Sequence, residues 1–88
     1  MDYEKIVHAL IDSILEEPES VLIRVSQLDE KNVDIVIAAE ATDTARLIGK
    51  RGIIANSLRE IISVAGKSEN THIHIKFESF GDDLDKEE

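Results

Sequence analysis

Two glycines separated by two cations form the stretch with the clearest chemical character, Ile48-Gly49-Lys50-Arg51-Gly52-Ile53. Glycine lacks a Cβ, so glycines at both ends of a four-residue turn permit positive φ and let an oxygen-rich ligand approach the backbone amides. A helix that begins near Gly52 adds unpaired N–H groups and the positive end of its dipole. The residue types and spacing therefore predict a phosphate-binding turn, with an ordinary turn between two helices as the alternative.

The distribution of charge supports the phosphate interpretation. The chain has a net charge of −9, which by itself argues against nucleic acid as a ligand. The window from Ala45 to Lys67, however, contains five cations and one anion, so its net charge is +4. The other positions contain five cations and eighteen anions, so their net charge is −13. A polyanion is therefore attracted to the glycine turn and repelled elsewhere, which gives orientation as well as affinity.

Size and composition limit the possible architecture. A chain of 88 residues with 42% hydrophobic content supports one small domain with one core. The absence of cysteine excludes a disulfide framework and a thiolate metal site. The acidic start at Met1–Lys5 does not resemble a signal peptide, and no apolar run reaches transmembrane length. We therefore expect a soluble cytoplasmic protein with no membrane contact.

The region before the turn predicts one helix and two strands. Apolar residues recur at three- and four-residue steps over Asp2–Glu16, which is typical of an amphipathic helix, and Pro18 should end it. Alternating patterns over 20–27 and 33–39 predict two strands joined as a hairpin. Val36 and Ala38 lie on the face of the second strand opposite its main apolar row.

Two further helices and a third strand are expected around and after the turn. Thr42 or Asp43 is a suitable N-cap for a short helix that ends at the first glycine of the turn. The apolar stripe after Gly52 predicts a longer helix, with Gly66 as its stop. Residues 71–77 alternate and predict the third strand.

The sequence gives little support for a metal site, a catalytic site or a nucleotide-binding loop. His72 and His74 share one strand face with Lys76, so a solvated edge is favoured over a metal site, and we expect no metal or other cofactor. An enzyme is not expected, because there is no cysteine and no Ser-His-acid set at a familiar spacing. The glycines are also too close together for a nucleotide-binding phosphate loop. Residues 81–88 have too few apolar side chains to become ordered, and they are predicted to form a disordered acidic tail.

At this point the chain resembles a known family. The run Leu47-Ile48-Gly49-Lys50-Arg51-Gly52, followed by Ala55, Leu58 and Arg59, resembles the KH domain of bacterial type II topology. One KH module of nearly the full chain length is similar to the small KhpA family of bacterial RNA-binding proteins, over about Tyr3 to Phe77. The resemblance implies an α+β fold of order α-β-β-α-α-β, with a three-stranded mixed sheet backed by three helices and a KH domain over residues 1–80.

The resemblance also implies a function and partners. KH domains of this kind bind single-stranded RNA, and the family implies a bacterial RNA chaperone or post-transcriptional regulator. It further implies a homodimer and pairing with a longer KH protein of the KhpB (Jag-like) family. The alternative is a dimerisation or interaction module with weak or vestigial RNA binding, although pairing alone does not require the positively charged window.

The expected RNA contacts follow from this interpretation. With aromatic residues at only 3%, the chain lacks a stacking platform, but a G-x-x-G loop clamps about four nucleotides while bases lie on an aliphatic floor. The candidates for that floor are Ile48, Ile53 or Ile54, Val36 and Ala38, with ordinary core packing as the alternative. Ile48 fits the floor or ordinary core packing, and Arg59 fits an RNA contact or a solvated helix charge. The predicted RNA-binding residues are Arg46, Ile48, Gly49, Lys50, Arg51, Gly52, Ile53, Ile54 and Arg59.

Overall fold

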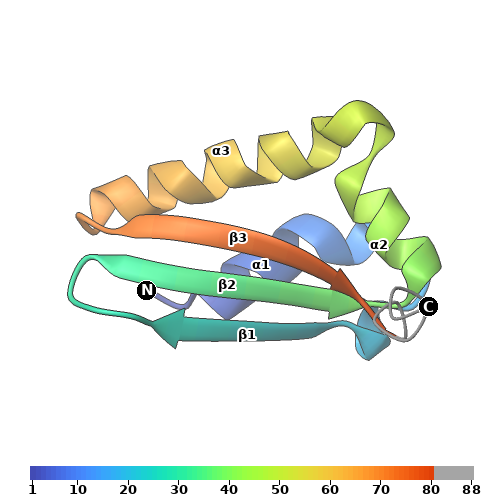
Figure 1. Cartoon of the computed structure of the whole chain (residues 1–88), viewed down its shortest axis with the longest axis horizontal. Helices are drawn as coiled ribbons and strands as arrows, with labels where there is room; N and C mark the ends of the chain where they lie inside the picture. Colours follow the sequence, from blue (N-terminus) through green and yellow to red (C-terminus); the bar gives the residue numbers. More distant parts are fainter. Residues whose placement is uncertain (81–88) are drawn as a thin grey trace, which may run out of the picture.

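A three-stranded mixed sheet forms one layer of the structure, and helices form the other (Figure 1). The computed structural model describes residues 1–80, and the predicted acidic tail at 81–88 lies outside the described residues. The strand order is β1-β2-β3, with β1 antiparallel and β3 parallel to β2. The expected α+β fold and element order are confirmed. The elements are α1 (Tyr3–Ile11), β1 (Leu22–Gln27), β2 (Asn32–Ala39), α2 (Ala41–Ile48), α3 (Ile53–Ser68) and β3 (His72–Ser79).

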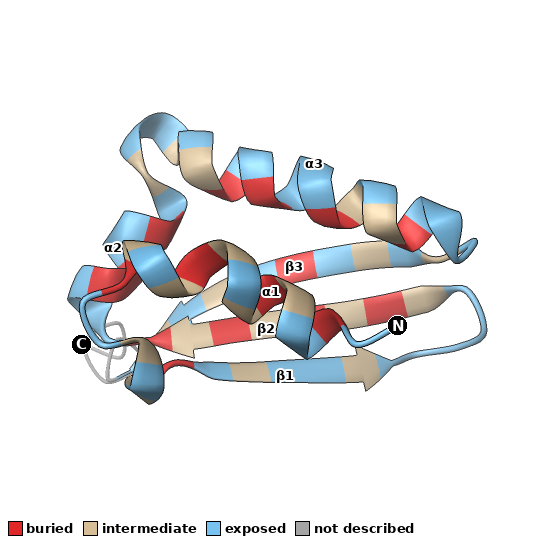
Figure 2. Ribbon diagram, turned by 180° about the vertical axis from the view of Figure 1, so that it is seen from behind, coloured by how far each residue is buried: buried red, intermediate tan, exposed pale blue. Residues whose placement is uncertain are grey.

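The core lies between the sheet and the helices. Alternate side chains of β2 are buried and face the helices, as the period of two predicts. Figure 2 shows buried segments on the sides of α1 and α3 that face the sheet. The largest fully buried side chains are Val7, Ile11, Val33, Ile35, Ile37, Leu47 and Ile62.

Helix α1 is shorter than the expected Asp2–Glu16. It ends at Ile11, and a single 3₁₀ turn follows at Asp12–Ile14. The main-chain N–H groups of Glu16 and Glu17 donate to the two carboxylate oxygens of Asp43, at 2.9 and 3.0 Å. These tertiary hydrogen bonds replace helical ones, so the chain leaves the helix well before Pro18, where a second 3₁₀ turn begins.

Neither Thr42 nor Asp43 is the N-cap of α2, so that prediction was wrong. The N-cap is Glu40, and no side chain caps the helix. Asp43 is 2% exposed and accepts the two N–H groups from the chain that follows α1. The Thr44 hydroxyl lies 3.2 Å from the carbonyl oxygens of Ala39 and Glu78, so it ties α2 to the ends of β2 and β3.

Helix α3 continues through Gly66, which was expected to stop it. A Cβ at Gly66 would lie 2.7 Å from the carbonyl oxygen of Thr71 and 2.6 Å from Cγ1 of Ile73. The glycine therefore allows the start of β3 to approach the helix closely. The chain turns at Asn70 instead, which has a φ of 58°.

The hairpin between β1 and β2 is closed by Asp29. Its carboxylate accepts the Lys31 N–H and the Asn32 side-chain amide, and these hydrogen bonds lower the pKa of Asp29. On the sheet face away from the helices, Arg24, Val36 and Lys76 share one position across the three strands. Within residues 1–80, no helix combines the length and apolar content needed to cross a membrane.

Candidate nucleic-acid interface

The loop between α2 and α3 has the backbone that its glycines predict. Gly49 has a φ of 74° and Gly52 a φ of 77°, and Arg51 between them also has a positive φ, 58°. A Cβ at Gly49 would lie 2.8 Å from Cγ1 of Ile54, whereas the space beside Gly52 is open. The loop is therefore a tight turn that favours glycine at both ends by conformation, and at Gly49 by packing as well.

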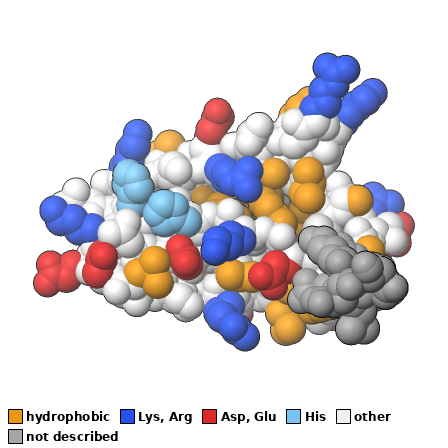
Figure 3. Space-filling model, viewed as in Figure 1, with side chains coloured by type: hydrophobic (Ala, Val, Ile, Leu, Met, Phe, Trp, Pro, Cys, Tyr) orange, Lys and Arg blue, Asp and Glu red, His pale blue; other side chains and the backbone are white. Residues whose placement is uncertain are grey.

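Lys50 and Arg51 are exposed at the tip of this loop. Neither side chain has an ion-pair partner among residues 1–80, where the ion pairs involve other groups. Figure 3 shows Lys and Arg side chains projecting from the molecule at the end where α2 meets α3. Both charges are therefore available to a ligand.

The same loop leads directly into the N-terminus of α3. Gly52 is the N-cap of this 16-residue helix, and no side chain caps it. The first amides of the helix and the positive end of its dipole thus lie beside Lys50 and Arg51. This arrangement can bind the oxygen atoms of a phosphate.

The aliphatic residues that were predicted to contact RNA lie in two different places. Ile53 is 61% exposed and Ile48 is 38% exposed, so both are accessible beside the loop, whereas Ile54 is half-buried and packs against the core. Val36 and Ala38 lie on the open face of the sheet, in register with Lys76 and Glu78. The sheet therefore separates these two residues from the core side, where Ile54 packs.

Arg59 lies one helical turn and a half into α3, above the edge strand. Its guanidinium carbon is 5.5 Å from the ring centroid of Phe77 on β3, and its Nη1 donates to the Asn56 side chain at 3.3 Å. A cation at this distance from an aromatic ring is held in place while its outer edge stays in solvent. Phe77 was expected only as a strand residue, because nothing in the sequence shows that it lies under Arg59.

Arg46 is separated from the other predicted cations by its ion pairs. Its Nη2 lies 2.8 Å from a Glu16 carboxylate oxygen, and its Nε lies 4.0 Å from Asp43. These pairs direct the side chain toward the segment between α1 and β1. The structure therefore brings Lys50, Arg51 and Arg59 onto the α3 side and leaves Arg46 with its acidic partners.

The two histidines of β3 remain on the open sheet face. The ring centroids of His72 and His74 are 5.8 Å apart, and both side chains are exposed. Among residues 1–80, no three His, Cys, Asp or Glu side chains are grouped as metal ligands.

Comparison with known proteins agrees with this architecture. The family model described as the KhpA/KhpB KH domain matches residues 4–77. No solved structure shows a significant match to the chain. The matched region begins in α1 and ends in β3, so it includes the loop and all three strands. The chain therefore belongs to the KhpA/KhpB family of KH domains, a nucleic-acid-binding kind of domain.

Proposed function

We propose that this protein binds single-stranded RNA and that the loop Gly49–Gly52 holds the RNA backbone. The observation that carries the proposal is the position of two exposed cations, without an ion-pair partner among residues 1–80, between two positive-φ glycines at the uncapped N-terminus of α3. Backbone amides and lysine or arginine side chains together are the usual donors to phosphate oxygens. Because the loop contacts the phosphates of the RNA and not its bases, it contributes affinity without sequence preference.

A single strand fits the remaining contacts better than a duplex. Ile48 and Ile53 are exposed beside the loop, and Arg59 is held over Phe77. Unpaired bases can pack on aliphatic side chains and stack on a guanidinium plane, whereas bases in an A-form duplex are hidden in its grooves. We assign Ile48, Ile53 and Arg59 to base contacts, and Arg59 can also reach a phosphate.

The proposed role in the cell is that of an RNA chaperone or post-transcriptional regulator. Few phosphate contacts and an acidic remainder of the chain favour rapid release of RNA. A protein that binds briefly and without strong sequence preference can act on many RNAs.

The test replaces both loop cations without altering the backbone. The double variant Lys50→Gln, Arg51→Asn removes two charges, and asparagine tolerates the left-handed conformation of position 51. We expect affinity for a short oligouridylate to fall about tenfold or more. The slope of log affinity against log salt should change from about −2 to about −0.7, from roughly −0.7 per phosphate contact.

The control is Lys5→Gln, which removes one exposed charge from α1. It should leave RNA affinity nearly unchanged, and urea unfolding should show that all variants fold. Unchanged affinity in the double variant, with the fold intact, would contradict the clamp.

A second function, self-association, is favoured by the outer face of α3. Apart from Ile53 beside the loop, which is assigned to base contacts, two apolar side chains are exposed on this helix within residues 1–80: Ile61 at 49% and Val64 at 67%. Exposed apolar rows on one helix are typical of a surface shared by two copies. We propose that this row forms a homodimer and that a longer KhpB (Jag-like) partner can occupy the same surface.

Sedimentation of Val64→Glu tests this interface. Because Val64 is exposed, a charge there should cost little folding stability but should shift the protein from dimer to monomer. Leu28→Glu is the matched control, since Leu28 is also exposed, at 57%, but lies in the hairpin turn. A monomeric unmodified protein, or equal effects of the two changes, would exclude this row as the interface.

A further inference from the structure

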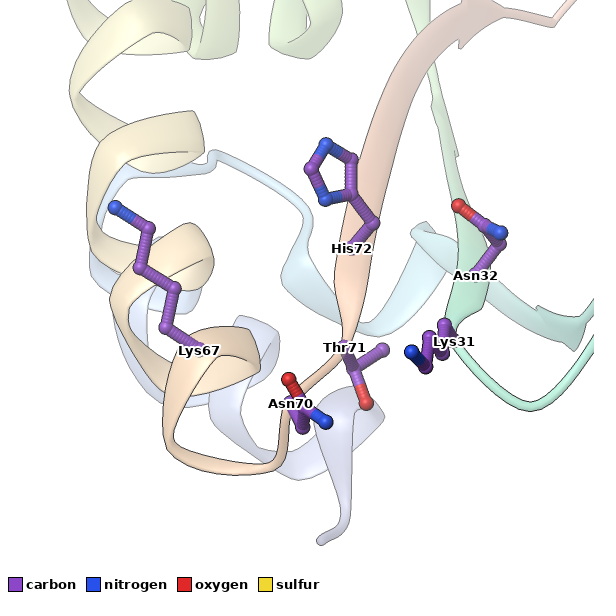
Figure 4. Close-up of a pocket in the computed structure, with 6 residues that line it drawn as sticks. All are labelled: Lys31, Asn32, Lys67, Asn70, Thr71 and His72. Carbon is purple, nitrogen blue, oxygen red and sulfur yellow. The ribbon is translucent and has the colours of Figure 1, made fainter.

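A polar hollow lies at the end of α3 that is far from the glycine loop (Figure 4). Its volume is about 460 Å³, and its lining comes from the hairpin turn, the end of α3 and the start of β3. No carboxylate lines it, although the chain contains 19 acidic residues. The lining residues are Lys31, Asn32, Lys67, Asn70, Thr71 and His72.

Backbone hydrogen bonds hold the three segments around this hollow. The His72 N–H donates to the Lys31 carbonyl at 2.6 Å, which joins β3 to the hairpin turn. The Thr71 N–H donates to the Gly66 carbonyl at 2.7 Å, and the Asn70 N–H donates to the Lys67 carbonyl at 3.0 Å. These hydrogen bonds hold the main chain around the hollow in place.

The charge of the hollow favours an anion. Lys31 and Lys67 both carry a positive charge. Two nearby acidic side chains have other partners: Asp29 accepts from Lys31 N–H and Asn32, and Glu69 lies 3.6 Å from the N-terminal ammonium.

The C-terminal dipole of α3 opposes an anion at this end. Its effect is reduced because the last carbonyls already accept hydrogen bonds. The Ser68 hydroxyl donates to Ala65, and the main-chain N–H groups of Glu69 and Asn70 donate to Gly66 and Lys67. The acceptors at this end of α3 are therefore largely occupied.

Smaller hollows connect this site to the RNA contacts proposed above. One of about 80 Å³ shares Lys67, Thr71 and His72 with the polar hollow and adds Ser63. Another of about 330 Å³ shares Ser63 and Lys67, extends to Arg59, and is also lined by Glu60 and Val64. The shared lining residues trace one path along α3, from Arg59 to the hairpin turn.

We propose that the polar hollow binds a backbone phosphate of the same RNA strand and so lengthens the RNA footprint beyond the nucleotides held at the loop. This inference rests on the proposed RNA-binding function. At about 1.5 Å per residue, Lys67 lies about 21 Å along α3 from Ile53. A G-x-x-G loop clamps about four nucleotides, so a strand that continues along α3 reaches the hollow with nucleotides beyond those.

The experiment compares a tetranucleotide and an octanucleotide of uridylate on the full chain. The double variant Lys31→Gln, Lys67→Gln should weaken octanucleotide binding about five- to tenfold and leave tetranucleotide binding unchanged. The salt slope for the octanucleotide should become shallower by about 0.7, for one lost phosphate contact. Lys5→Gln is the control for the loss of charge alone, and urea unfolding checks the fold of each variant.

The outcomes separate this inference from the function on which it rests. Suppose that the Lys50→Gln, Arg51→Asn variant loses binding of both RNAs while the Lys31→Gln, Lys67→Gln variant binds both normally. This result would support the loop as an RNA site and overturn the hollow as a second site. If Lys5→Gln weakened octanucleotide binding as much as the lysine pair does, the effect would come from net charge alone. That result would also overturn the second site. Amide shifts at Lys67 and His72 with uridine monophosphate, without preference for the longer RNA, would assign the hollow to small phosphates instead. If neither RNA binds the unmodified protein, both proposals fail.

Discussion

Gly49 and Gly52 occupy different backbone conformations, although both have positive φ. Gly49 has a ψ of 177°, in a region that residues with a Cβ almost never enter. Gly52 has a ψ of 15°, which is the left-handed helical region that asparagine tolerates. The first glycine is therefore the more demanding position of the loop.

Alanine at these two positions should differ in its effect on folding. We expect Gly49→Ala to lower the free energy of unfolding by about 2–4 kcal/mol, because it adds strain and a contact with Ile54. Gly52→Ala should cost about 1–2 kcal/mol, from conformation alone. Urea unfolding measures both. Gly52→Asn is the control and should cost less than Gly52→Ala, and equal losses at the two glycines would contradict the assigned conformations.

The sequence predicted the loop well because its residues are adjacent along the chain. Positive φ follows from the glycines themselves, and the exposure of Lys50 and Arg51 follows from their place between them. The positive φ of Arg51 was not predictable, since arginine has no preference for that region. Arg59 over Phe77, and the ion pair of Arg46 with Glu16, depend on contacts between distant segments.

At the scale of elements, Gly66 shows how packing overrides helix propensity. Alanine is favoured over glycine by about 1 kcal/mol inside a helix. At Gly66, however, the added Cβ would lie 2.7 Å from the Thr71 carbonyl oxygen, which is backbone and cannot rotate away. The position therefore couples α3 to β3.

We predict that Gly66→Ala lowers the free energy of unfolding by about 1–3 kcal/mol despite the better helix propensity. The control is Ser57→Ala on the exposed face of α3, which should raise stability by a few tenths of a kcal/mol. Thermal or urea unfolding compares the two. A more stable Gly66→Ala protein would show that β3 does not approach the helix as closely as described.

The existence and type of each helix and strand were predictable, whereas several ends were not. Periods of two and of three to four residues identify the strands and helices because one face of each is buried. The ends depend on hydrogen bonds that periodicity does not encode. The Asp43 carboxylate accepts the main-chain N–H groups of Glu16 and Glu17, so α1 is shorter than expected. Helix α3 continues through Gly66 to Ser68.

At the scale of the whole molecule, the charge is divided between one positive window and an acidic remainder. The window from Ala45 to Lys67 contains the second half of α2, the loop and most of α3, so folding gathers its charge on one helical pair. The remainder repels a polyanion, and this repulsion acts over a longer range at low salt. RNA should therefore approach the α2–α3 side.

Residues 82–88 contain five acids and Lys86, and we expect this charge to add to the repulsion. Truncation after Phe80 keeps all described elements, including the hydrogen bond from Phe80 N–H to the Ala39 carbonyl at 2.9 Å. We predict that the truncated protein binds a short oligouridylate roughly two- to fivefold more tightly at low salt, because less negative charge opposes the RNA. The gain should vanish as the Debye length falls toward about 8 Å at physiological ionic strength. Sedimentation should show the same oligomeric state before and after truncation, and unaltered affinity at low salt would show that these acids do not oppose RNA binding.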